Sequence, residues 1–238
     1  KESEEAVREL NATKVRFFSI IANVMKSPFN SIVGFSELLK DEVKYLSPDE
    51  ISNYAAAIYN SAKNTLGLLD NLLDWARMQQ NRMLFEPKLK VLKQIVDDVF
   101  MEIGTVAQAK SINLFEDVPG DIIVYVDENM FKTLIRNLVS NAVKFTKPGG
   151  TVKVLAVKEL NRVILSVTDT GVGISRENIE KLFDIGAGFT TRGTENEKGT
   201  GLGLILCKEF VARHGGKISV ESETGVGSKF IVELPQNI

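Results

Sequence analysis

TDTGVGI, residues 168–174, sets an acid and two glycines at the end of the alternating run RVILSVTD. A second glycine run, KGTGLGL at residues 198–204, opens an apolar helical pattern. Glycine adopts backbone angles that other residues avoid, and it lets main-chain N–H groups approach a ligand closely. A glycine turn that leads into a helix N-terminus is a ready anion site. One such turn is usually only a tight turn. Two of them, with an acid that can accept a hydrogen bond from the amine of a base, predict one bound nucleotide.

The composition is that of an ordinary globular protein and argues against several functions. The chain has 238 residues, of which 44% are hydrophobic and 25% charged. Its net charge of −2 provides no basic field, so we expect no nucleic-acid partner. Cys207 is the single cysteine, which rules out a disulfide framework within the chain and fits a reducing compartment.

No apolar run is long enough to span a bilayer, and no signal peptide is visible. The chain begins within a helical pattern, KESEEAVREL, which predicts that it is a fragment of a longer protein. We expect this fragment to be cytoplasmic, while membrane anchoring of the full-length protein stays open. The charged start is interpreted as a solvated helical extension toward an upstream sensor module.

Residues 1–85 have a helical pattern throughout. From residue 3 to 45, apolar residues recur at spacings of three and four in two adjacent stripes, with Pro28 expected to kink the helix. Ser47-Pro48-Asp49-Glu50 is a capped start for a second helix that runs to about Met83. The seam predicted for that helix comprises Ile51, Ala55, Ile58, Ala62, Thr65, Leu69, Leu72 and Ala76. A lone hairpin leaves apolar faces exposed, so we predict a homodimer in which residues 1–85 of two chains form a four-helix bundle.

Glu86-Pro87 marks a domain boundary, after which strands and helices mix in residues 86–238. We predict helices over residues 91–110, 128–145, 175–183 and 201–214. We predict strands over residues 112–117, 121–127, 151–159, 162–169, 217–223 and 227–235, and a mobile loop over 184–200. This order indicates an α+β sandwich with helices over one face of a mixed sheet.

The predicted helix before the first glycine turn contains NLVSNAVKFT, residues 137–146. Asn137, Asn141 and Lys144 are spaced by four and three residues, so they share one face of the helix. Asparagine has a low helix propensity, so two asparagines in the middle of a helix indicate a functional role. Two amides and a lysine on one face can hold Mg²⁺ and phosphate oxygens, because magnesium takes oxygen ligands. A merely solvated polar face would explain Lys144 but not the two asparagines.

Five motifs in order carry a resemblance to a known family. NLVSNAVKFT, DTGVGI, LFDIGAGFTTRG, GTGLGL and GVGSKF resemble the N, G1, F, G2 and G3 boxes of sensor histidine kinases. The upstream stretch FFSIIANVMKSPFNSIVGFSELL resembles their phosphoacceptor box. The resemblance implies a dimerisation and histidine-phosphotransfer hairpin over residues 1–85. It also implies a catalytic ATP-binding domain of the gyrase, chaperone and histidine kinase superfamily over residues 86–238.

The family's functional residues carry over onto matching positions. Asn141 looks like the Mg²⁺ ligand, Asn137 and Lys144 look like phosphate contacts, and Asp169 looks like the acceptor for the adenine amine. By the same resemblance, Gly171 and Gly173 look like the glycines that shape the pocket, Arg192 looks like a residue that reaches the γ-phosphate, and Phe183 and Phe189 look like the phenylalanines that dock the lid. Gly199, Gly201 and Gly203 look like the lid hinge and phosphate-binding turn. The ATP-binding set implied by the resemblance also includes Phe145, Ile174, Thr191, Thr200, Leu202 and Ser228.

The sequence departs from the family at its chemical centre. Asn23 stands where the family has its phosphorylated histidine, and Val24 stands where an adjacent acid usually activates that histidine. An amide nitrogen is not a nucleophile, so we predict that autophosphorylation is lost. The family's phosphatase activity, linked to that acid and to the polar position of Ser27, should also be impaired. Asn23 is either an introduced replacement in a competent kinase or the mark of a natural pseudokinase that acts as an ATP-gated interaction module.

Asn137 also bears on the reaction type. Hydrolases of the superfamily carry a glutamate four residues before the magnesium asparagine, and Asn137 cannot act as a general base there. The resemblance therefore implies phosphoryl transfer to a bundle histidine and onward to an aspartate on a response-regulator receiver domain, not hydrolysis. His214 is interpreted as a helix-end residue beside a glycine cap, and Cys207 as a core residue.

Overall fold

The computed structural model describes residues 22, 25–79, 84–184, 190–195, 197 and 201–236. The chain divides into two compact units, Lys1–Met83 and Leu84–Ile238. Within the described ranges, no helix is both long and apolar enough to cross a bilayer. Asn23, Val24, Phe189, Gly199 and Thr200, which the sequence singled out, lie outside the described residues.

The first unit contains a helical hairpin. Residues 25–42 are helical, and α2 spans Pro48–Gln79. The predicted capping box is confirmed, because the Ser47 backbone N–H donates to Glu50 Oε2 at 2.8 Å and the Glu50 N–H donates to Ser47 Oγ at 3.3 Å. Phe35 packs against Tyr54 across the hairpin with ring centroids 5.3 Å apart.

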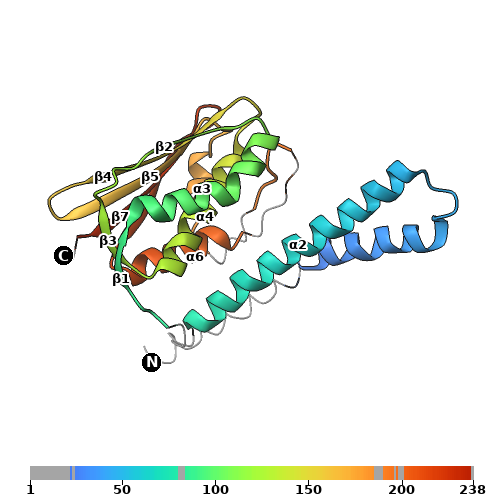
Figure 1. The fold of residues 1–238 in the computed structure, drawn as a ribbon, viewed down its shortest axis with the longest axis horizontal. Coiled ribbons are helices and arrows are strands. Elements are labelled where there is room, and N and C mark those ends of the chain that lie inside the picture. Colours follow the sequence, from blue (N-terminus) through green and yellow to red (C-terminus); the bar gives the residue numbers. More distant parts are fainter. Residues whose placement is uncertain are drawn as a thin grey trace. The chain divides into compact units, whose positions relative to one another are not determined.

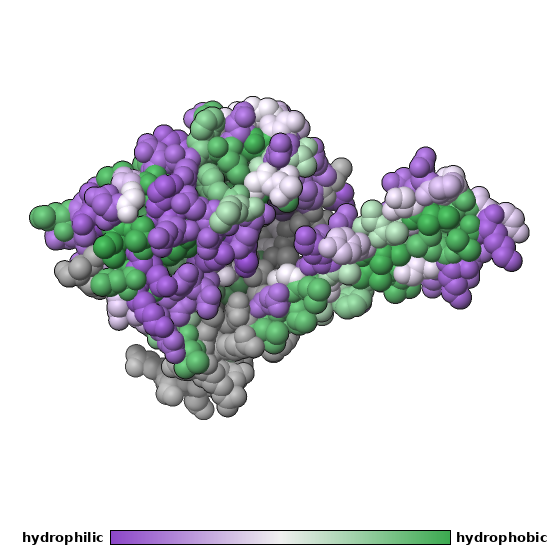
Figure 2. Space-filling view, viewed as in Figure 1, coloured by the Kyte–Doolittle hydropathy of each residue, from purple (hydrophilic) through white to green (hydrophobic). Residues whose placement is uncertain are grey.

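The predicted seam of α2 needs a correction. Leu68, which the seam left out, is 2% exposed, whereas Leu69 is 38% exposed. The apolar face of α2 is therefore wider than the predicted seam. Some of its leucines, Leu66, Leu69 and Leu73, are exposed among the described residues of this chain. Figure 2 shows hydrophobic surface along the hairpin. Its exposed members include Phe29, Val33, Leu66, Leu69 and Leu73.

The second unit is built on a five-stranded mixed sheet in the order β2-β4-β5-β7-β6. Its strands are β2 (Asn113–Asp117), β4 (Thr151–Lys158), β5 (Arg162–Asp169), β6 (Lys217–Glu223) and β7 (Gly227–Pro235). β2 runs parallel to β4, and the other neighbours are antiparallel. Alternation in the strands turns one apolar row inward. That row, at most 5% exposed, comprises Val152, Val154, Ala156, Val163, Leu165, Val167, Phe230, Val232 and Leu234.

Three helices cover this inner face (Figure 1). They are α3 (Leu92–Ala109), α4 (Glu128–Phe145) and α6 (Gly203–Arg213). Each presents an apolar stripe to the sheet, and that of α4 includes Leu134 and Leu138, both fully buried. The expectation of an α+β fold with helices over one face of a mixed sheet is confirmed.

Three details differ from the sequence-based expectation. Lys88–Val91 forms a short strand, β1, which pairs with β3 (Ile123–Val126) in a separate two-stranded sheet. The predicted strand at 121–127 therefore does not join the main sheet, and Val91 ends a strand where a helix start was expected. The predicted helix at 175–183 shrinks to α5 (Arg176–Ile179), and the Ser175 side chain makes no cap hydrogen bond to it.

Candidate functional site

Asp169 anchors the site at the end of β5. The alternation of β5 turns this carboxyl inward, where the residue is 6% exposed. Asp169 Oδ1 accepts hydrogen bonds from the Gly171 N–H at 2.8 Å and the Ser228 N–H at 3.3 Å. Burial raises the pKa of Asp169, and the two N–H donors oppose that rise without cancelling it. The result is a fixed, buried acceptor of the kind that can read an amine on a base.

The glycines after Asp169 are required by close backbone contacts. A Cβ on Gly171 would lie 2.4 Å from the Phe145 carbonyl oxygen. Gly173 has φ +67°, and a Cβ there would lie 1.9 Å from the Glu223 carbonyl oxygen. The turn is also tied to the end of α4, because the Val172 N–H donates to the Phe145 carbonyl at 3.1 Å. The turn therefore packs against α4 and the β6–β7 connection with no room for side chains.

Ile174 and Ser228 meet through a residue that the sequence did not single out. The Ile174 N–H donates to Ser222 Oγ at 2.8 Å, and Ser222 Oγ lies 2.9 Å from Ser228 Oγ. The Ser222 hydroxyl is also 2.8 Å from the Gly227 carbonyl oxygen. A half-buried serine on β6 had no distinguishing signal in the sequence, because serine is common on the outer positions of strands.

The asparagines and the lysine of α4 follow one another along one side of the helix, as predicted. The Asn137 side-chain nitrogen is buried and makes no hydrogen bond to a nitrogen or oxygen of the described residues, although the Cys207 thiol lies beside the Asn137 side chain. A Cβ on Gly203 would lie 3.5 Å from Cγ and Oδ1 of Asn137 and 3.7 Å from its Nδ2, so the first residue of α6 packs against this amide group. An orphaned buried donor costs about 1–3 kcal/mol, which is a reason to expect that a ligand satisfies it. Asn141 is half-buried one turn further on.

Lys144 closes this row at the end of α4. Its ammonium lies 4.6 Å from the Phe145 ring centroid and donates to the Thr191 carbonyl at 3.4 Å. Burial lowers the pKa of Lys144, the nearby charge of Glu197 acts against this, and that of Lys110 adds to it. A partly desolvated ammonium interacts strongly with an anion that approaches it.

The structure also places the remaining predicted residues. Thr191 and Arg192 are exposed, Gly201 has φ +73°, and Leu202 is a buried residue at the N-terminal boundary of α6. Ser27 lies half-buried in the helix over residues 25–42, where its carbonyl accepts the Ser31 hydroxyl at 3.2 Å.

Two residues that the sequence assigned to structural roles have them. Cys207 is fully buried, and burial raises the pKa of its thiol to about 12, which keeps it inert. His214 ends α6 beside Gly215, which has φ +72°.

The donor set fits a nucleotide with a bound magnesium ion. The orphaned Asn137 amide, the oxygen of Asn141 and the half-buried ammonium of Lys144 suit phosphate and a hard cation. The buried Asp169 carboxyl suits a base amine. These groups lie on α4 and at the end of β5. The turn with Gly171 and Gly173 lies between them and packs against the Phe145 and Glu223 carbonyls.

The chain resembles known proteins in both units. Residues 126–238 match the family of histidine kinase-, DNA gyrase B- and HSP90-like ATPases, and residues 13–81 match the phospho-acceptor domain of His kinase A. The solved catalytic domain of the histidine kinase ThkA is 31% identical with a TM-score of 0.56, over 63% of this chain and 96% of that one. The chain belongs to the sensor histidine kinase family.

Two further relatives show how much of a histidine kinase this chain covers. The sensor protein SrrB of Staphylococcus aureus (strain N315) is 28% identical over 95% of the chain, which spans only 39% of SrrB. The histidine kinase ThkA in complex with the response regulator TrrA shares the fold of both units, with a TM-score of 0.76 and 24% identity over 99% of this chain and 66% of that one. The predicted family and the predicted fold class are both confirmed.

Proposed function

We propose that the C-terminal unit binds Mg·ATP between α4 and the two glycine turns. The observation that carries this proposal is the buried Asn137 amide, whose nitrogen has no nitrogen or oxygen partner among the described residues and which packs against the first residue of α6. Asp169, held by two backbone N–H groups, is the acceptor for the adenine amine. Membership of an ATP-binding family supports the same ligand.

Three residues of α4 would contact the magnesium ion and the phosphates. Asn141 would hold Mg²⁺ through its amide oxygen, while Asn137 and Lys144 would contact phosphate oxygens. The ion would supply neutralisation of the charge that develops during phosphoryl transfer. Gly201, Leu202 and Gly203 present backbone N–H groups at the start of α6, where the helix dipole favours an anion. Phe145, Ile174, Thr191, Arg192 and Ser228 complete the proposed contact set.

We propose further that this chain does not phosphorylate itself. The support is its sequence: Asn23 offers no nucleophilic nitrogen, and Val24 offers no base to activate one. The chain otherwise keeps the family's motifs, so the function we infer is that of a sensor histidine kinase core. Such a core phosphorylates a bundle histidine and passes the group to an aspartate on a response regulator, and with Asn23 at the acceptor position we expect the first of these steps to be lost in this chain.

The partners follow from the hairpin. Exposed apolar side chains along α2 and residues 25–42 support a homodimer, in which two hairpins close a four-helix bundle. The structure titled as ThkA in complex with the response regulator TrrA supports a response-regulator receiver domain as a partner of this chain as well. An upstream sensor module would act through the N-terminal helix.

A second function is favoured by the same two positions. Asn23 and Val24 are both changed in a phosphoacceptor stretch that is otherwise retained, which suits a natural pseudokinase better than a single replacement. In that case, ATP binding would change the conformation of the dimer without group transfer.

Restoring the acceptor tests the proposal. Asn23→His combined with Val24→Glu is incubated with γ-labelled ATP and Mg²⁺, after sedimentation has established the expected dimer of the 26.3 kDa chain. We expect acid-labile label on the restored chain and none on the original, because only the former has a nucleophile with an adjacent base.

Asn23→Gln with Val24→Glu is the matched control, since it changes the same positions without adding a nucleophile. Label on the original chain would contradict the proposed loss of activity. If the restored chain binds ATP but takes up no label, the transfer machinery is defective too, and the pseudokinase function stands instead. Steady-state phosphate release should stay at background in every variant, because Asn137 cannot act as a general base.

A further inference from the structure

Lys110 is a buried cation outside the residue set discussed above. It caps the C-terminal end of α3, and its side chain is only 5% exposed. Its ammonium donates to the Val143 carbonyl at 3.1 Å, the Lys144 carbonyl at 2.8 Å and Glu197 Oε1 at 2.6 Å. An ammonium has three hydrogens to donate, so these partners account for all of them. Burial of a charge is costly unless it is paired and hydrogen-bonded in this way.

Two of those partners belong to the last turn of α4. Carbonyls in the last turn of a helix lack partners within the helix, and a positive charge there is favoured by the helix dipole. Lys110 therefore fixes the end of α4 from a different helix, next to Lys144, the proposed phosphate contact.

The third partner, Glu197, extends the contact to the turn formed by residues 193–195. Glu197 Oε2 accepts the Glu195 N–H at 2.7 Å, and the Glu197 carbonyl accepts the Gly193 N–H at 2.8 Å. A Cβ on Gly193 would lie 2.3 Å from Glu197 Oε2 and 2.8 Å from the Lys144 carbonyl oxygen. Hydrogen bonds from Lys110 and from backbone N–H groups outweigh the effect of burial and lower the pKa of Glu197, so this carboxylate is charged.

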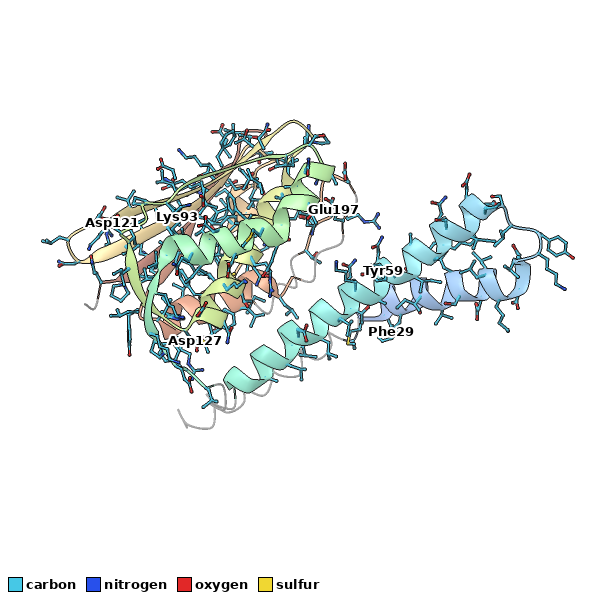
Figure 3. The ribbon with its side chains drawn as sticks, in the orientation of Figure 1. Phe29, Tyr59, Lys93, Asp121, Asp127 and Glu197 are labelled. Atoms are coloured by element: carbon cyan, nitrogen blue, oxygen red, sulfur yellow. The ribbon has the colours of Figure 1, made fainter. Side chains whose placement is uncertain are left out.

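Thr194 completes the attachment of this turn to α4. Its N–H donates to the Lys144 carbonyl at 3.1 Å, and its hydroxyl donates to the Thr146 carbonyl at 2.9 Å. The Lys144 carbonyl thus accepts from both Lys110 and Thr194. Figure 3 shows Glu197 beside the C-terminal end of α3, at the opposite end of that helix from Lys93.

We propose that Lys110 and Glu197 are a positioning pair for the phosphate end of the nucleotide site. Lys110 sets the last turn of α4 and, through Glu197, the turn 193–195, so that Lys144 and the backbone around it are in place before a phosphate arrives. The proposal rests on the proposed nucleotide site. It makes a specific claim within it: the pair contributes to the affinity for phosphates and not to the affinity for adenosine, which Asp169 reads elsewhere.

The test compares the affinities of adenosine, ADP and a non-hydrolysable ATP analogue with Mg²⁺, on the whole chain. Lys110→Met should weaken binding of the ATP analogue about tenfold, equivalent to about 1.4 kcal/mol, while the affinity for adenosine is unchanged. Glu197→Gln, on a turn that is partly exposed, should show the same selectivity even if Lys110→Met fails to fold. The double variant should be no weaker than Lys110→Met alone, because the two side chains act as a unit.

Lys93→Met is the matched control. It makes the same substitution at the other end of α3 and also removes ion pairs, with Asp97 and Glu116. It should leave all three affinities unchanged. Amide hydrogen exchange without nucleotide adds a readout that does not depend on binding, and Thr194 and Glu195 should exchange faster in Lys110→Met but not in Lys93→Met.

Two results separate this proposal from the nucleotide site on which it rests. If the original chain binds no nucleotide, the proposed function itself is wrong. If the original chain binds the ATP analogue but both pair variants keep its affinity, or lose adenosine and ATP affinity equally, the pair has no positioning role at the phosphates.

Discussion

Gly227 determines whether Asp169 can be held in place. Its φ is +139°, and a Cβ there would lie 2.0 Å from the Asp169 carbonyl oxygen. This close approach lets the next residue, Ser228, direct its N–H at the Asp169 carboxyl. Gly225, two residues earlier, also has a positive φ of +86°, but a Cβ there would meet nothing within 4 Å. The two glycines therefore differ in crowding more than in backbone conformation.

Alanine at these two glycines should have unequal effects. Gly225→Ala should lower the free energy of unfolding by about 1–2 kcal/mol, the cost of a left-handed backbone for an L-residue. Gly227→Ala adds a clash with backbone, so we expect a loss of about 3 kcal/mol or more and weaker adenosine binding. Urea unfolding measures the free energy of unfolding of both variants, and titration calorimetry measures their adenosine binding. Equal losses in both variants would show that the contact with Asp169 contributes nothing.

Some residues of the site were predictable from sequence and others were not. Asp169, Gly171 and Gly173 were recognisable because they follow a strand and because a second glycine run, at residues 198–204, accompanies them. Lys110 and Ser222 have ordinary sequence surroundings. Their contacts come from segments more than thirty residues away or from a neighbouring strand, and no local pattern contains that information.

At the scale of elements, His214 connects the end of α6 to the start of α4, away from the proposed nucleotide site. His214 Nδ1 lies 2.7 Å from the Phe210 carbonyl oxygen, and Nε2 accepts the Asp127 N–H at 3.0 Å. Nδ1 must therefore carry the proton of a neutral ring. Asp127 in turn caps α4, because its Oδ1 accepts the Met130 N–H at 3.1 Å. Its Oδ2 accepts the Glu86 N–H at 3.1 Å, so the start of this unit is fastened to the same cap (Figure 3).

This arrangement predicts a pH-dependent stability. Burial lowers the pKa of His214 below its usual 6.5, despite the opposing carbonyl of Phe210 and charge of Asp127. The unfolded chain then binds more protons than the folded one as pH falls through about 6.5. Stability should therefore be full above pH 6.5 and decline below it. Urea midpoints between pH 7.5 and 5 measure this.

His214→Gln provides the control, because His214 is the only histidine of the chain. This variant should be less stable at pH 7.5 but should lose less stability on acidification. Parallel pH profiles for the two proteins would mean that His214 does not stay neutral in the folded state.

The elements themselves were largely predictable. α4 begins and ends at the predicted residues, because Asp127 is a strong cap and the apolar period is unbroken. β1 was missed, because the alternation of Lys88–Val91 covers only four residues and leads directly into the apolar pattern of α3. α5 is shorter than predicted at its C-terminal end, because the backbone continues there in turns with Lys181, Leu182 and Asp184 N–H groups bonded three residues back. The seam of α2 was displaced, since adjacent leucines leave the choice of face to packing.

At the scale of the whole molecule, the two units have separate requirements. The hairpin was predicted from helical periodicity, and its exposed apolar side chains support pairing with a second copy of the chain. The α/β unit was predicted from glycine turns and strand alternation, and the buried amide nitrogen of Asn137 supports the proposal of a bound ligand. The acceptor change at Asn23 lies in the first unit, and the proposed nucleotide contacts lie in the second. Loss of phosphoryl transfer should therefore leave nucleotide binding intact.

Isothermal titration of the unaltered chain with a non-hydrolysable ATP analogue, with and without Mg²⁺, tests this most directly. We predict measurable heat and a raised melting temperature with Mg²⁺. Asn141→Ala should weaken the Mg²⁺-dependent binding at least about tenfold, or about 1.4 kcal/mol, and change the metal-free binding little. No heat and no melting shift at saturating analogue and Mg²⁺ would contradict the account, because the asparagine face of α4 would then hold no nucleotide.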